Sequence, residues 1–470
     1  MELHQRLLLS AALLLAATAA AGADLERLGQ LAARGARISA GVWDLDTDQP
    51  VAQLAPAQRL TPASLSKVMV AAAALDTWAP DKTFGTSLDA VTAPAGGTVT
   101  GDIVLRGEGD ATLDETTLWS LAAQLRSQGI HRIAGRVLVE RAPFGELACD
   151  TIDRCSGLRS SSRAYNAAPS AIGVNYGSWC LTVRAPVDAN HATVGGCATG
   201  DLPIPLAGSV RVGAQGPALT IERSTDQQGD RITVGGSIAP GEERSVHRAM
   251  SDPAAGAGQI LRSILLQAGI SVDGGVQTTV RAPAAIRRLA HVDGLLLQEQ
   301  VGRMMRWSNN YIADVLTMGI ALARSGTAPA SLAEAAHGLV AGNGAIMDSG
   351  SGLTVSNRLS AQDLIDVLRH EYRDPRRFPA FYGAFVVPRD APFDFVKQGS
   401  ADWLDRVALK TGTLSDPVSV TGIAGFLRKK TGGFMAFAIL VNGGERLPQV
   451  PLGDALSAAR TDLETVLSHY

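Results

Sequence analysis

The order in which helix and strand signals follow one another constrains the fold of this chain more than any other feature. Apolar residues with helical spacing occur at residues 61–75 and return after about residue 290. Between them, from about 86 to 285, glycine, threonine and valine dominate, and short alternating runs such as "GTVTGDIVLRG" and "DRITVGGSIA" are bounded by glycine turns. Such runs are typical of β-strands. A long β-rich segment therefore separates two segments that contain helices.

Strand signals also precede the first helix, and others follow the later helices in "VALKTGTLS", "VTGIAGFLR" and "GFMAFAILVNG", before one last helix. We therefore predict an α/β domain formed by both ends of the chain, residues 24–85 and 286–470. The mostly β insertion is expected to form two further domains, one from residues 86–165 and 259–285 and one from residues 166–258. A length of 470 residues agrees with about three domains.

The N-terminus is typical of a cleavable secretory signal over residues 1–23. Arg6 precedes an uncharged run rich in leucine and alanine, and an Ala-Gly-Ala triplet ends at Ala23. The run is short for a membrane span, and no later stretch is long and apolar enough to cross a bilayer. The last segment of the chain is short and not basic, so it lacks the features of an amphipathic anchor. We expect an exported protein with at most loose membrane association.

The cysteines agree with export. Cys149, Cys155, Cys180 and Cys197 lie within 49 positions. An even, clustered set in an exported chain favours two disulfides, for which three connectivities are possible. Pairing of neighbours, Cys149 with Cys155 and Cys180 with Cys197, is preferred. Zinc binding is a poorer interpretation because no C-x-x-C spacing is present.

Lysine usage draws attention to one short stretch. The chain has 36 arginines and only six lysines, and Lys67 follows Ser64 by three positions at the start of the first apolar helix. Residues three apart on a helix are neighbours. Arginine does not lose its proton in a protein, whereas a partly buried lysine can act as a base. Ser64 is therefore a candidate nucleophile that Lys67 deprotonates, although a capping serine beside a solvated lysine would have the same spacing.

Two more polar stretches occur among the later helices. Ser308-Asn309-Asn310 interrupts a helical pattern in "RWSNNYIADVL", which helix capping alone would also explain. The stretch at residues 348–352, Asp-Ser-Gly-Ser-Gly, is expected to be a turn near the active site, with a structural rather than a catalytic role.

A second lysine stands in an apolar strand. Lys410-Thr411-Gly412 occurs in "RVALKTGTLS", where the lysine can attract a carboxylate and the glycine lets a ligand approach the strand closely. The same tripeptide begins at Lys430, but there charged residues and glycines surround it between two apolar runs. That pattern is typical of an exposed hairpin turn. We therefore assign the function to Lys410 and the turn to Lys430.

The three motifs together resemble a known set. S-x-x-K, S-x-N and K-T-G, in that order, are the motifs of the penicillin-binding proteins and serine β-lactamases. Ser308 follows Ser64 by 244 positions, far more than in class A β-lactamases. The long insertion, the length and the exported N-terminus resemble the D-alanyl-D-alanine carboxypeptidase/endopeptidases of peptidase family S13, of the DacB or penicillin-binding protein 4 type. "LRGEGDATLD", "AAPSAIGVNY" and "MDSGSGLTVSNRLS" are similar to that family as well.

The resemblance implies a fold and a reaction. The fold is an α/β transpeptidase domain like that of penicillin-binding proteins and serine β-lactamases, with two inserted domains. The reaction is hydrolysis of the D-Ala-D-Ala bond of peptidoglycan stem peptides through an acyl-serine, with possible action on D-Ala-diamino acid cross-links. β-Lactams would be covalent inhibitors, and family habit places the enzyme in the periplasm. No metal or other cofactor is implied.

The resemblance also implies a role for each motif residue. Ser64 would be the acylated nucleophile, Lys67 its proton acceptor, and Ser308 the relay of a proton to the leaving D-alanine. The substrate-binding residues would be Asn310, Lys410, Thr411, Gly412 and Thr413. Of these, Asn310 would hold the substrate amide, and Lys410 and Thr411 the terminal carboxylate. The backbone N–H groups of Ser64 and Thr413 would form the oxyanion hole.

One stretch departs from the family pattern. Some members are thought to hold the amino group of the stem peptide's diamino acid with an acidic residue, but the matching stretch here, "SGLRSSSRAYNAAPS", has none. Recognition of that side chain is therefore in doubt, and carboxypeptidase or endopeptidase preference stays open.

Other functions have less support. G-x-S-x-G and H-E-x-x-H are absent, so neither a Ser-His-Asp hydrolase of that kind nor zinc hydrolysis is favoured. A net charge of −3 gives no support for nucleic acid binding. A non-hydrolytic peptidoglycan- or β-lactam-binding protein and a serine β-lactamase stay as alternatives, which turnover of a β-lactam would separate.

Overall fold

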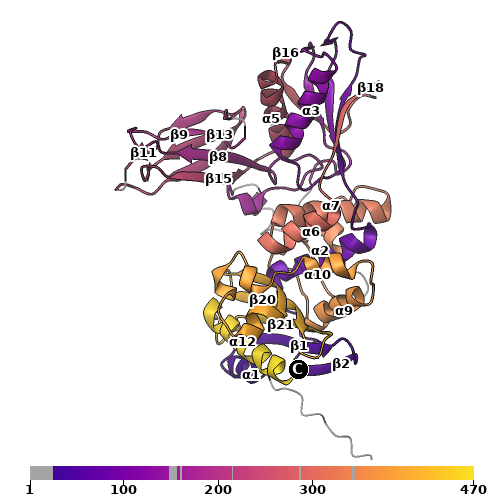
Figure 1. The fold of residues 1–470 in the computed structure, drawn as a ribbon, viewed down its shortest axis with the longest axis vertical. Coiled ribbons are helices and arrows are strands. Elements are labelled where there is room, and N and C mark those ends of the chain that lie inside the picture. The colour runs from indigo at the N-terminus through magenta and orange to yellow at the C-terminus, as the bar shows by residue number, and fades with distance from the viewer. Residues whose placement is uncertain are drawn as a thin grey trace, which may run out of the picture.

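The chain forms two parts that lie one above the other along the long axis of the computed structural model (Figure 1). The structure describes residues 25–147, 156–158, 161–198, 200–213, 215–284, 287–340 and 344–470. We call residues 25–77 and 297–470 the terminal part, because both ends of the chain build it, and residues 85–293 the inserted part. The expected signal at residues 1–23 lies outside the described residues.

A five-stranded antiparallel sheet forms the centre of the terminal part. Its strand order is β19-β20-β21-β1-β2, so the first strand of the chain lies against the last one. The pairing of β1 with β21 runs from Arg37 opposite Asn442 to Asp44 opposite Met435. The strands are β1 (Arg37–Asp44), β2 (Gln49–Leu54), β19 (Val407–Leu414), β20 (Val420–Arg428) and β21 (Phe434–Asn442).

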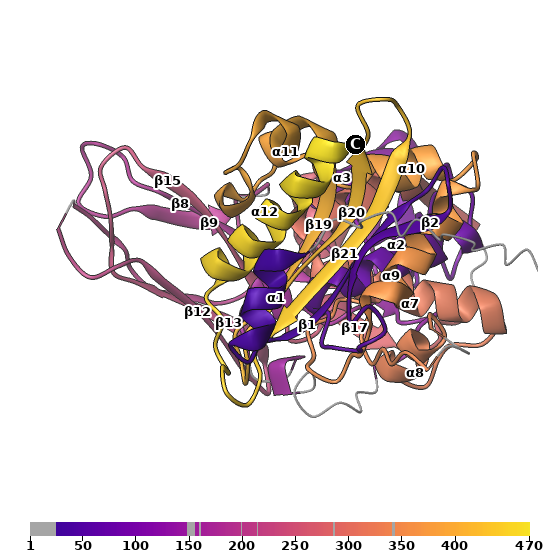
Figure 2. The ribbon, with the colours of Figure 1, turned by 90° about the horizontal axis from the view of Figure 1, so that it is seen from below.

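Helices cover both faces of this sheet, because its strands are apolar on both sides. Figure 2 shows α1 (Glu26–Ala33) and α12 (Leu452–His469) on one face, and α11 (Ala401–Arg406) contributes to the same apolar core. The helices whose apolar residues belong to the other core are α2 (Ser66–Thr77), α6 (Leu297–Trp307), α7 (Asn310–Ser325), α8 (Leu332–His337), α9 (Ala361–Tyr372) and α10 (Phe378–Gly383). None of the helices in the described ranges is long and apolar enough to cross a membrane.

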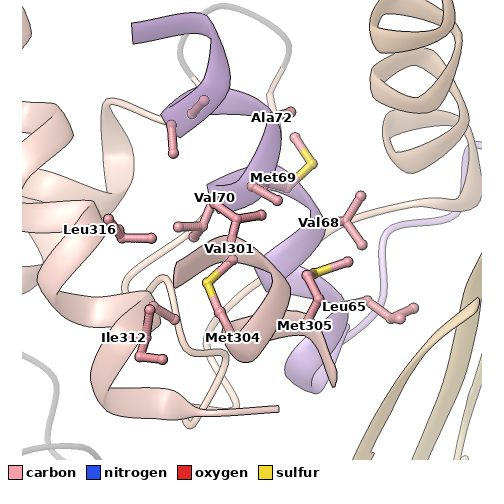
Figure 3. Close-up of a cluster of buried hydrophobic side chains, with 14 of the residues drawn as sticks. Leu65, Val68, Met69, Val70, Ala72, Val301, Met304, Met305, Ile312 and Leu316 are labelled. Carbon is pink, nitrogen blue, oxygen red and sulfur yellow. The ribbon is translucent and has the colours of Figure 1, made fainter. Parts of the chain in front are cut away.

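Helix α2 is buried on every side. Its residues from Ser66 to Leu75 are all buried, and they include four successive alanines. A helix that is apolar all round is stable only inside a core, and alanines let neighbouring helices approach closely. Figure 3 shows Val68, Met69 and Val70 of α2 with side chains of α6 and α7 around them. The segment that carries Ser64 is therefore held on a rigid, enclosed helix.

The inserted part begins with a second five-stranded sheet, in the order β17-β7-β5-β3-β18. A small three-stranded sheet, in the order β16-β6-β4, lies beside it, and two helices pack on the same apolar core. The elements are β3 (Gly85–Ala90), β4 (Thr98–Val99), β5 (Ile103–Gly107), α3 (Glu115–Ser127), β6 (Arg132–Ile133), β7 (Val137–Glu140), α5 (Pro253–Gln267), β16 (Ser271–Val272), β17 (Val276–Thr279) and β18 (Arg287–Asp293).

Three smaller sheets, drawn at the left of Figure 1, project from the inserted part. Their strands are β8 (Ser178–Arg184), β9 (Thr193–Gly196), β10 (Leu206–Gly208), β11 (Arg211–Val212), β12 (Thr220–Asp226), β13 (Gly229–Gly235), β14 (Ser237–Ile238) and β15 (Glu243–Ala249). Cys180 of β8 is bonded to Cys197 just after β9, which confirms one of the two preferred disulfides. The other pair, Cys149 and Cys155, lies outside the described residues.

The α/β class and the β-rich insertion are confirmed, with differences in detail. β18 pairs with β3 in the inserted sheet, although its residues were expected in the terminal domain. Helix α5 begins at Pro253, before the expected boundary at residue 259, and packs against α3. Helices α1, α3 and α5 had not been expected. Buried residues of both regions of the insertion belong to one apolar core.

Candidate active site

Ser64 lies on a tight turn that leads directly into the buried helix α2. The turn is the 3₁₀-helix η1 (Ala63–Leu65), and α2 begins at Ser66. Ser64 is half-buried, whereas Lys67, one turn further, is fully buried. The Lys67 amine Nζ lies 2.9 Å from Ser64 Oγ. The spacing in the sequence therefore brings the two side chains together, as expected for residues three apart.

The Lys67 amine has two further oxygen partners. Nζ donates to Asn310 Oδ1 at 2.8 Å and to the backbone carbonyl of Ser351 at 2.6 Å. Asn310 opens helix α7, and Ser351 belongs to the Asp-Ser-Gly-Ser-Gly stretch. A lysine head group has three positions for hydrogens or a lone pair, and these two oxygens and Ser64 Oγ all lie within hydrogen-bond distance of Nζ. The orientation of the amine toward Ser64 is therefore fixed from two other sides.

Ser308 lies in the break between helices α6 and α7. It ends α6 in the left-handed conformation, with φ of 54°, which is uncommon for a residue other than glycine. The next residue, Asn309, caps α7 by accepting the backbone N–H of Ile312. Capping was the alternative explanation for this motif, and Asn309 does perform it. Ser308 and Asn310, on either side, are left to face the Ser64 turn and the strand β19.

Lys410 reaches Ser308 from strand β19. Its Nζ donates to Ser308 Oγ at 2.9 Å and to the carbonyl of Thr411 at 2.6 Å. The side chain is only 2% exposed, and Met305, Val386 and Phe393 line a small apolar space beside it. Burial away from water lowers the pKa of Lys410 to about 7. Among the described residues no carboxylate forms an ion pair with it.

Gly412 brings β19 against the Ser64 turn. A Cβ atom at this position would lie 2.7 Å from the Pro62 carbonyl oxygen and 3.1 Å from the backbone nitrogen of Ser64. Real Cβ atoms do not come this close to backbone atoms, so the approach requires glycine. The glycine was expected to let a ligand approach the strand, and in the structure the segment that approaches it is the Ser64 turn of the chain itself.

The backbone of Thr413 faces the same gap. β19 is the edge strand of its sheet, and Leu409 exchanges hydrogen bonds with Val386 on the outer side. In an antiparallel strand, alternate residues point their N–H and C=O groups to the same side. Thr411 and Thr413 therefore point these groups outward like Leu409, and the residue between them, Gly412, meets the Ser64 turn. Thr411 is half-buried and Thr413 is exposed.

The inserted part contacts this site at Tyr165. Asn310 Nδ2 donates to the carbonyl of Tyr165 at 3.0 Å, and Tyr165 lies in the 3₁₀-helix η2 (Ala164–Asn166). Its side chain is 56% exposed. This contact places the acid-free stretch, as far as it is described, at the edge of the site.

Sequence reasoning missed two contributors. The Ser351 carbonyl accepts from Lys67, although its stretch had been given a structural role only. Asp314, fully buried on α7, accepts the backbone N–H of Ser351 at 2.9 Å. A backbone carbonyl leaves no mark in a sequence. Asp314 does leave one, because a lone aspartate four residues after Asn310 in an apolar helix is unusual.

The second K-T-G is remote from these residues. Lys430 lies in the turn between β20 and β21, is 58% exposed, and pairs with Asp402 at 3.4 Å. The prediction that this tripeptide forms an exposed hairpin turn is confirmed. Within the described ranges, no group of three or more histidine, cysteine or acidic side chains is placed to hold a metal ion.

The sheet between two helical layers, with a serine and lysine on a buried helix beside the edge strand, defines the class of serine acyl-transfer enzymes that includes penicillin-binding proteins and serine β-lactamases. Residues 22–460 match the family model of the D-Ala-D-Ala carboxypeptidase 3 (S13) family. The chain belongs to this family. The resemblance inferred from the three motifs is confirmed, and with it a serine-type D-Ala-D-Ala carboxypeptidase.

Curated relatives agree with this membership. The chain is 28% identical over 447 residues to a D-alanyl-D-alanine carboxypeptidase of Actinomadura sp. (strain R39), covering 91% of this chain and 81% of that protein. It is 24% identical over 438 residues to the D-alanyl-D-alanine carboxypeptidase DacB of Haemophilus influenzae, covering 90% of this chain and 89% of that protein.

Solved structures share the fold. Penicillin-binding protein 4 (dacB) of Haemophilus influenzae superimposes with a TM-score of 0.74 at 20% identity, over 94% of this chain and 99% of that one. The peptidoglycan endopeptidase Bd3459 of Bdellovibrio bacteriovorus, in a form acylated by penicillin G, gives a TM-score of 0.51 at 16% identity, over 92% and 93% of the two chains. The predicted fold class, with its large β-rich insertion, is therefore confirmed.

Proposed function

We propose that this chain hydrolyses the D-Ala-D-Ala bond of peptidoglycan stem peptides through an acyl-enzyme on Ser64, and that β-lactams acylate the same serine. The observation that carries the proposal is the placement of the Lys67 amine, 2.9 Å from Ser64 Oγ. Membership of the S13 family and the names of the curated relatives support the substrate class.

Lys67 acts as the general base in this proposal. A neutral amine has two N–H bonds and one lone pair. The oxygens of Asn310 and Ser351 accept both N–H bonds, so the lone pair points to the remaining partner, the hydroxyl of Ser64. Ser64 Oγ attacks the carbonyl carbon of the penultimate D-alanine while its proton passes to Lys67.

Backbone N–H groups stabilise the charge that develops on the substrate carbonyl oxygen. The two donors would be the N–H of Thr413, which follows Gly412, and the N–H of Ser64, whose nitrogen lies 3.1 Å from a Cβ atom placed on Gly412. Donors fixed in advance, within a site from which water is excluded, stabilise a tetrahedral intermediate strongly. Ser64 is thus both nucleophile and oxyanion donor.

Ser308 and Lys410 serve the leaving group. Ser308 donates its hydroxyl proton to the departing nitrogen, so that the C–N bond breaks and D-alanine leaves as an amine. Lys410, 2.9 Å away, replaces that proton. Together with Thr411, Lys410 also holds the terminal carboxylate of the substrate. This carboxylate gives the buried amine an anionic partner, which none of the described carboxylates of the chain provides. Water then attacks the acyl carbonyl carbon, and the bond to Ser64 Oγ breaks as that oxygen takes back the proton held on Lys67. The proton that the water gives up returns to Lys410, and the shortened peptide leaves as a carboxylate.

The cellular compartment of the enzyme follows from its substrate. Peptidoglycan lies outside the cytoplasmic membrane, so the substrate requires an exported enzyme. The signal-like N-terminus supports export, and the family supports the periplasm. Association with the membrane is at most loose.

Intact mass measured after incubation with benzylpenicillin tests the proposal. The mature protein should gain the mass of one penicilloyl group, the Ser64→Ala variant should gain none, and the Lys67→Ala variant should react far more slowly. A wild-type protein that takes up no label, with the drug left intact, contradicts the proposal and favours a non-hydrolytic peptidoglycan-binding protein. Drug consumed without a lasting adduct indicates a serine β-lactamase.

A further inference from the structure

Asp314 is a fully buried carboxylate close to the candidate active site, and none of the three motifs includes it. It lies four residues after Asn310 on α7, so the two side chains lie on one face of the helix. Its Oδ1 accepts the backbone N–H of Ser351 at 2.9 Å and the hydroxyl of Ser349 at 3.2 Å. Burial of a carboxylate costs free energy of folding, so an aspartate at this position is expected to have a specific role.

The segment that Asp314 holds alternates serine and glycine. Both serines are fully buried, and their hydroxyls lie 2.6 Å apart beside the Asp314 carboxylate. A Cβ atom on Gly350 would lie 2.0 Å from Thr317 Oγ1 of α7. A Cβ atom on Gly352 would lie 2.0 Å from the carbonyl oxygen of Ala63, beside Ser64. The serines therefore interact with the Asp314 carboxylate, and the glycines let the segment fit between α7 and the Ser64 turn.

The segment ends at the Lys67 amine. The carbonyl of Ser351 accepts from Lys67 Nζ at 2.6 Å, while the N–H of the same residue is held by Asp314. Helix α7 thus supplies one acceptor for Lys67 directly, through Asn310, and controls the second through Asp314. A displaced Ser351 carbonyl would release one N–H of the amine and let its lone pair turn away from Ser64.

We propose that Asp314 is a positioning residue for acylation: it fixes the Ser351 carbonyl so that the Lys67 amine keeps its lone pair directed at Ser64. Asp314 acts through its hydrogen bonds to Ser349 and Ser351 of the segment. The proposal rests on the proposed function, in which Lys67 is the base. It adds a fixed residue on α7 to the three motifs that the chain shares with penicillin-binding proteins.

The test separates binding of benzylpenicillin from the acylation step that follows. Rates of Ser64 acylation, measured over a range of drug concentrations, give the acylation rate constant and the preceding dissociation constant. Asp314→Ala should lower the rate constant by about 10- to 100-fold, because a misplacement of about 1 Å at a reacting group can cost about 100-fold in rate. The dissociation constant should stay near the wild-type value. Asp314→Asn keeps an oxygen that accepts the same two hydrogen bonds and should recover most of the rate.

Asp462 offers a matched control. It is also a buried aspartate that accepts backbone N–H groups, those of Arg27 and Leu28, but it joins α12 to α1 far from Ser64. Asp462→Ala should lower the melting temperature and leave the acylation rate constant unchanged. Equal rate losses in Asp462→Ala and Asp314→Ala, or equal losses in Asp314→Asn and Asp314→Ala, would overturn the positioning role.

Ser349→Ala keeps the test decisive if Asp314→Ala does not fold. It removes one donor to Asp314 and the contact between the two serine hydroxyls. A several-fold lower acylation rate constant supports the proposal, whereas a wild-type rate in Ser349→Ala counts against it. Failure of the proposed function has a different signature, because the wild-type protein itself would then take up no penicilloyl group.

Discussion

Lys410 and Ser308 meet at a distance of 2.9 Å between Nζ and Oγ, although 102 positions separate them in the sequence. The lysine comes from the edge strand β19, and the serine from the break between two helices. Because burial lowers the pKa of Lys410 to about 7, the amine in this contact changes between charged and neutral within the neutral pH range.

We predict that acylation by carboxylate-bearing ligands weakens as the pH rises through about 7. Below that pH the Lys410 amine of the free enzyme is protonated and attracts a carboxylate, and above it the amine is neutral. The second-order acylation rate constant reports groups of the free enzyme. A charge-assisted hydrogen bond contributes about 1.5–3 kcal/mol, so the loss should be roughly 10- to 100-fold.

The measurement compares benzylpenicillin with its methyl ester between pH 5.5 and 9. The ratio of the two rate constants should fall as the pH rises, because any titration of Lys67 affects both ligands alike. In Lys410→Ala the ratio should be low and independent of pH, and in Lys430→Ala, the variant of the second K-T-G, it should match the wild type. A wild-type ratio that stays constant with pH contradicts the assignment of Lys410.

Gly412 gives a second prediction. Gly412→Ala should abolish measurable acylation of Ser64, because the added methyl group would meet the Pro62 carbonyl oxygen at 2.7 Å and push β19 from the Ser64 turn. Gly302→Ala on α6 is the matched control, since nothing lies within 4 Å of the added Cβ. It should keep acylation and stabilise the helix by about 0.5–1 kcal/mol. Intact mass with benzylpenicillin and thermal unfolding follow both variants, and normal labelling of Gly412→Ala would show that the close approach is dispensable.

The site could be predicted largely because its chemistry depends on side chains in three short motifs. Ser64 and Lys67 are brought together by a local spacing, and the helix break at Ser308 is visible in the pattern of apolar residues. The backbone carbonyl of Ser351 could not be predicted as an acceptor for Lys67, because a backbone group leaves no mark in a sequence. The contact of Asn310 with the inserted part likewise uses a backbone carbonyl, that of Tyr165.

The helices that were missed show what a local pattern lacks. No side chain next to α1 caps its first turn, and Asp462, 434 positions away, accepts the N–H of Leu28 instead. Helix α5 does carry a local start signal, because Asp252 caps it and Pro253 stands at its first turn. The β-rich sequence on either side nevertheless led to a prediction of strands rather than a helix in this region. Membership of β18 in the inserted sheet depends on its pairing with β3, which no local pattern fixes.

The Cys180–Cys197 disulfide should stabilise the inserted part without affecting acylation. It bridges a separation of 17 positions between β8 and the end of β9, in the sheets that project from the molecule. A loop of that size contributes about 3 kcal/mol when closed. The double variant Cys180→Ser/Cys197→Ser should therefore unfold at lower urea concentration but still bind one penicilloyl group. Loss of labelling in a variant that remains folded would show that these sheets support the site directly.

Glu371 is a fully buried glutamate of α9 on the far side of α2 from the inserted part, and neither of its oxygens accepts a hydrogen bond within the described part of the chain. Arg377 Nε is its nearest charge, at 3.5 Å, with the ring of His370 at 3.9 Å. Burial raises the pKa of Glu371 to about 7, aided by the negative charges of Asp76 and Asp374, while Arg377 opposes the shift. The folded protein therefore binds this proton more tightly than the unfolded chain, whose pKa is about 4.5.

We predict that the wild-type protein loses stability as the pH rises from about 4.5 to about 7, because the proton that favours the folded state is lost over this range. Glu371→Gln stays neutral and should avoid that loss. Its free energy of unfolding in urea should exceed the wild-type value at pH 8 by up to about 3 kcal/mol and approach it near pH 5. Glu26→Gln, which changes an exposed glutamate of α1, should follow the wild type at every pH. A Glu371→Gln variant less stable than the wild type at pH 8 would show that the ion pair with Arg377 outweighs the cost of burying the charge.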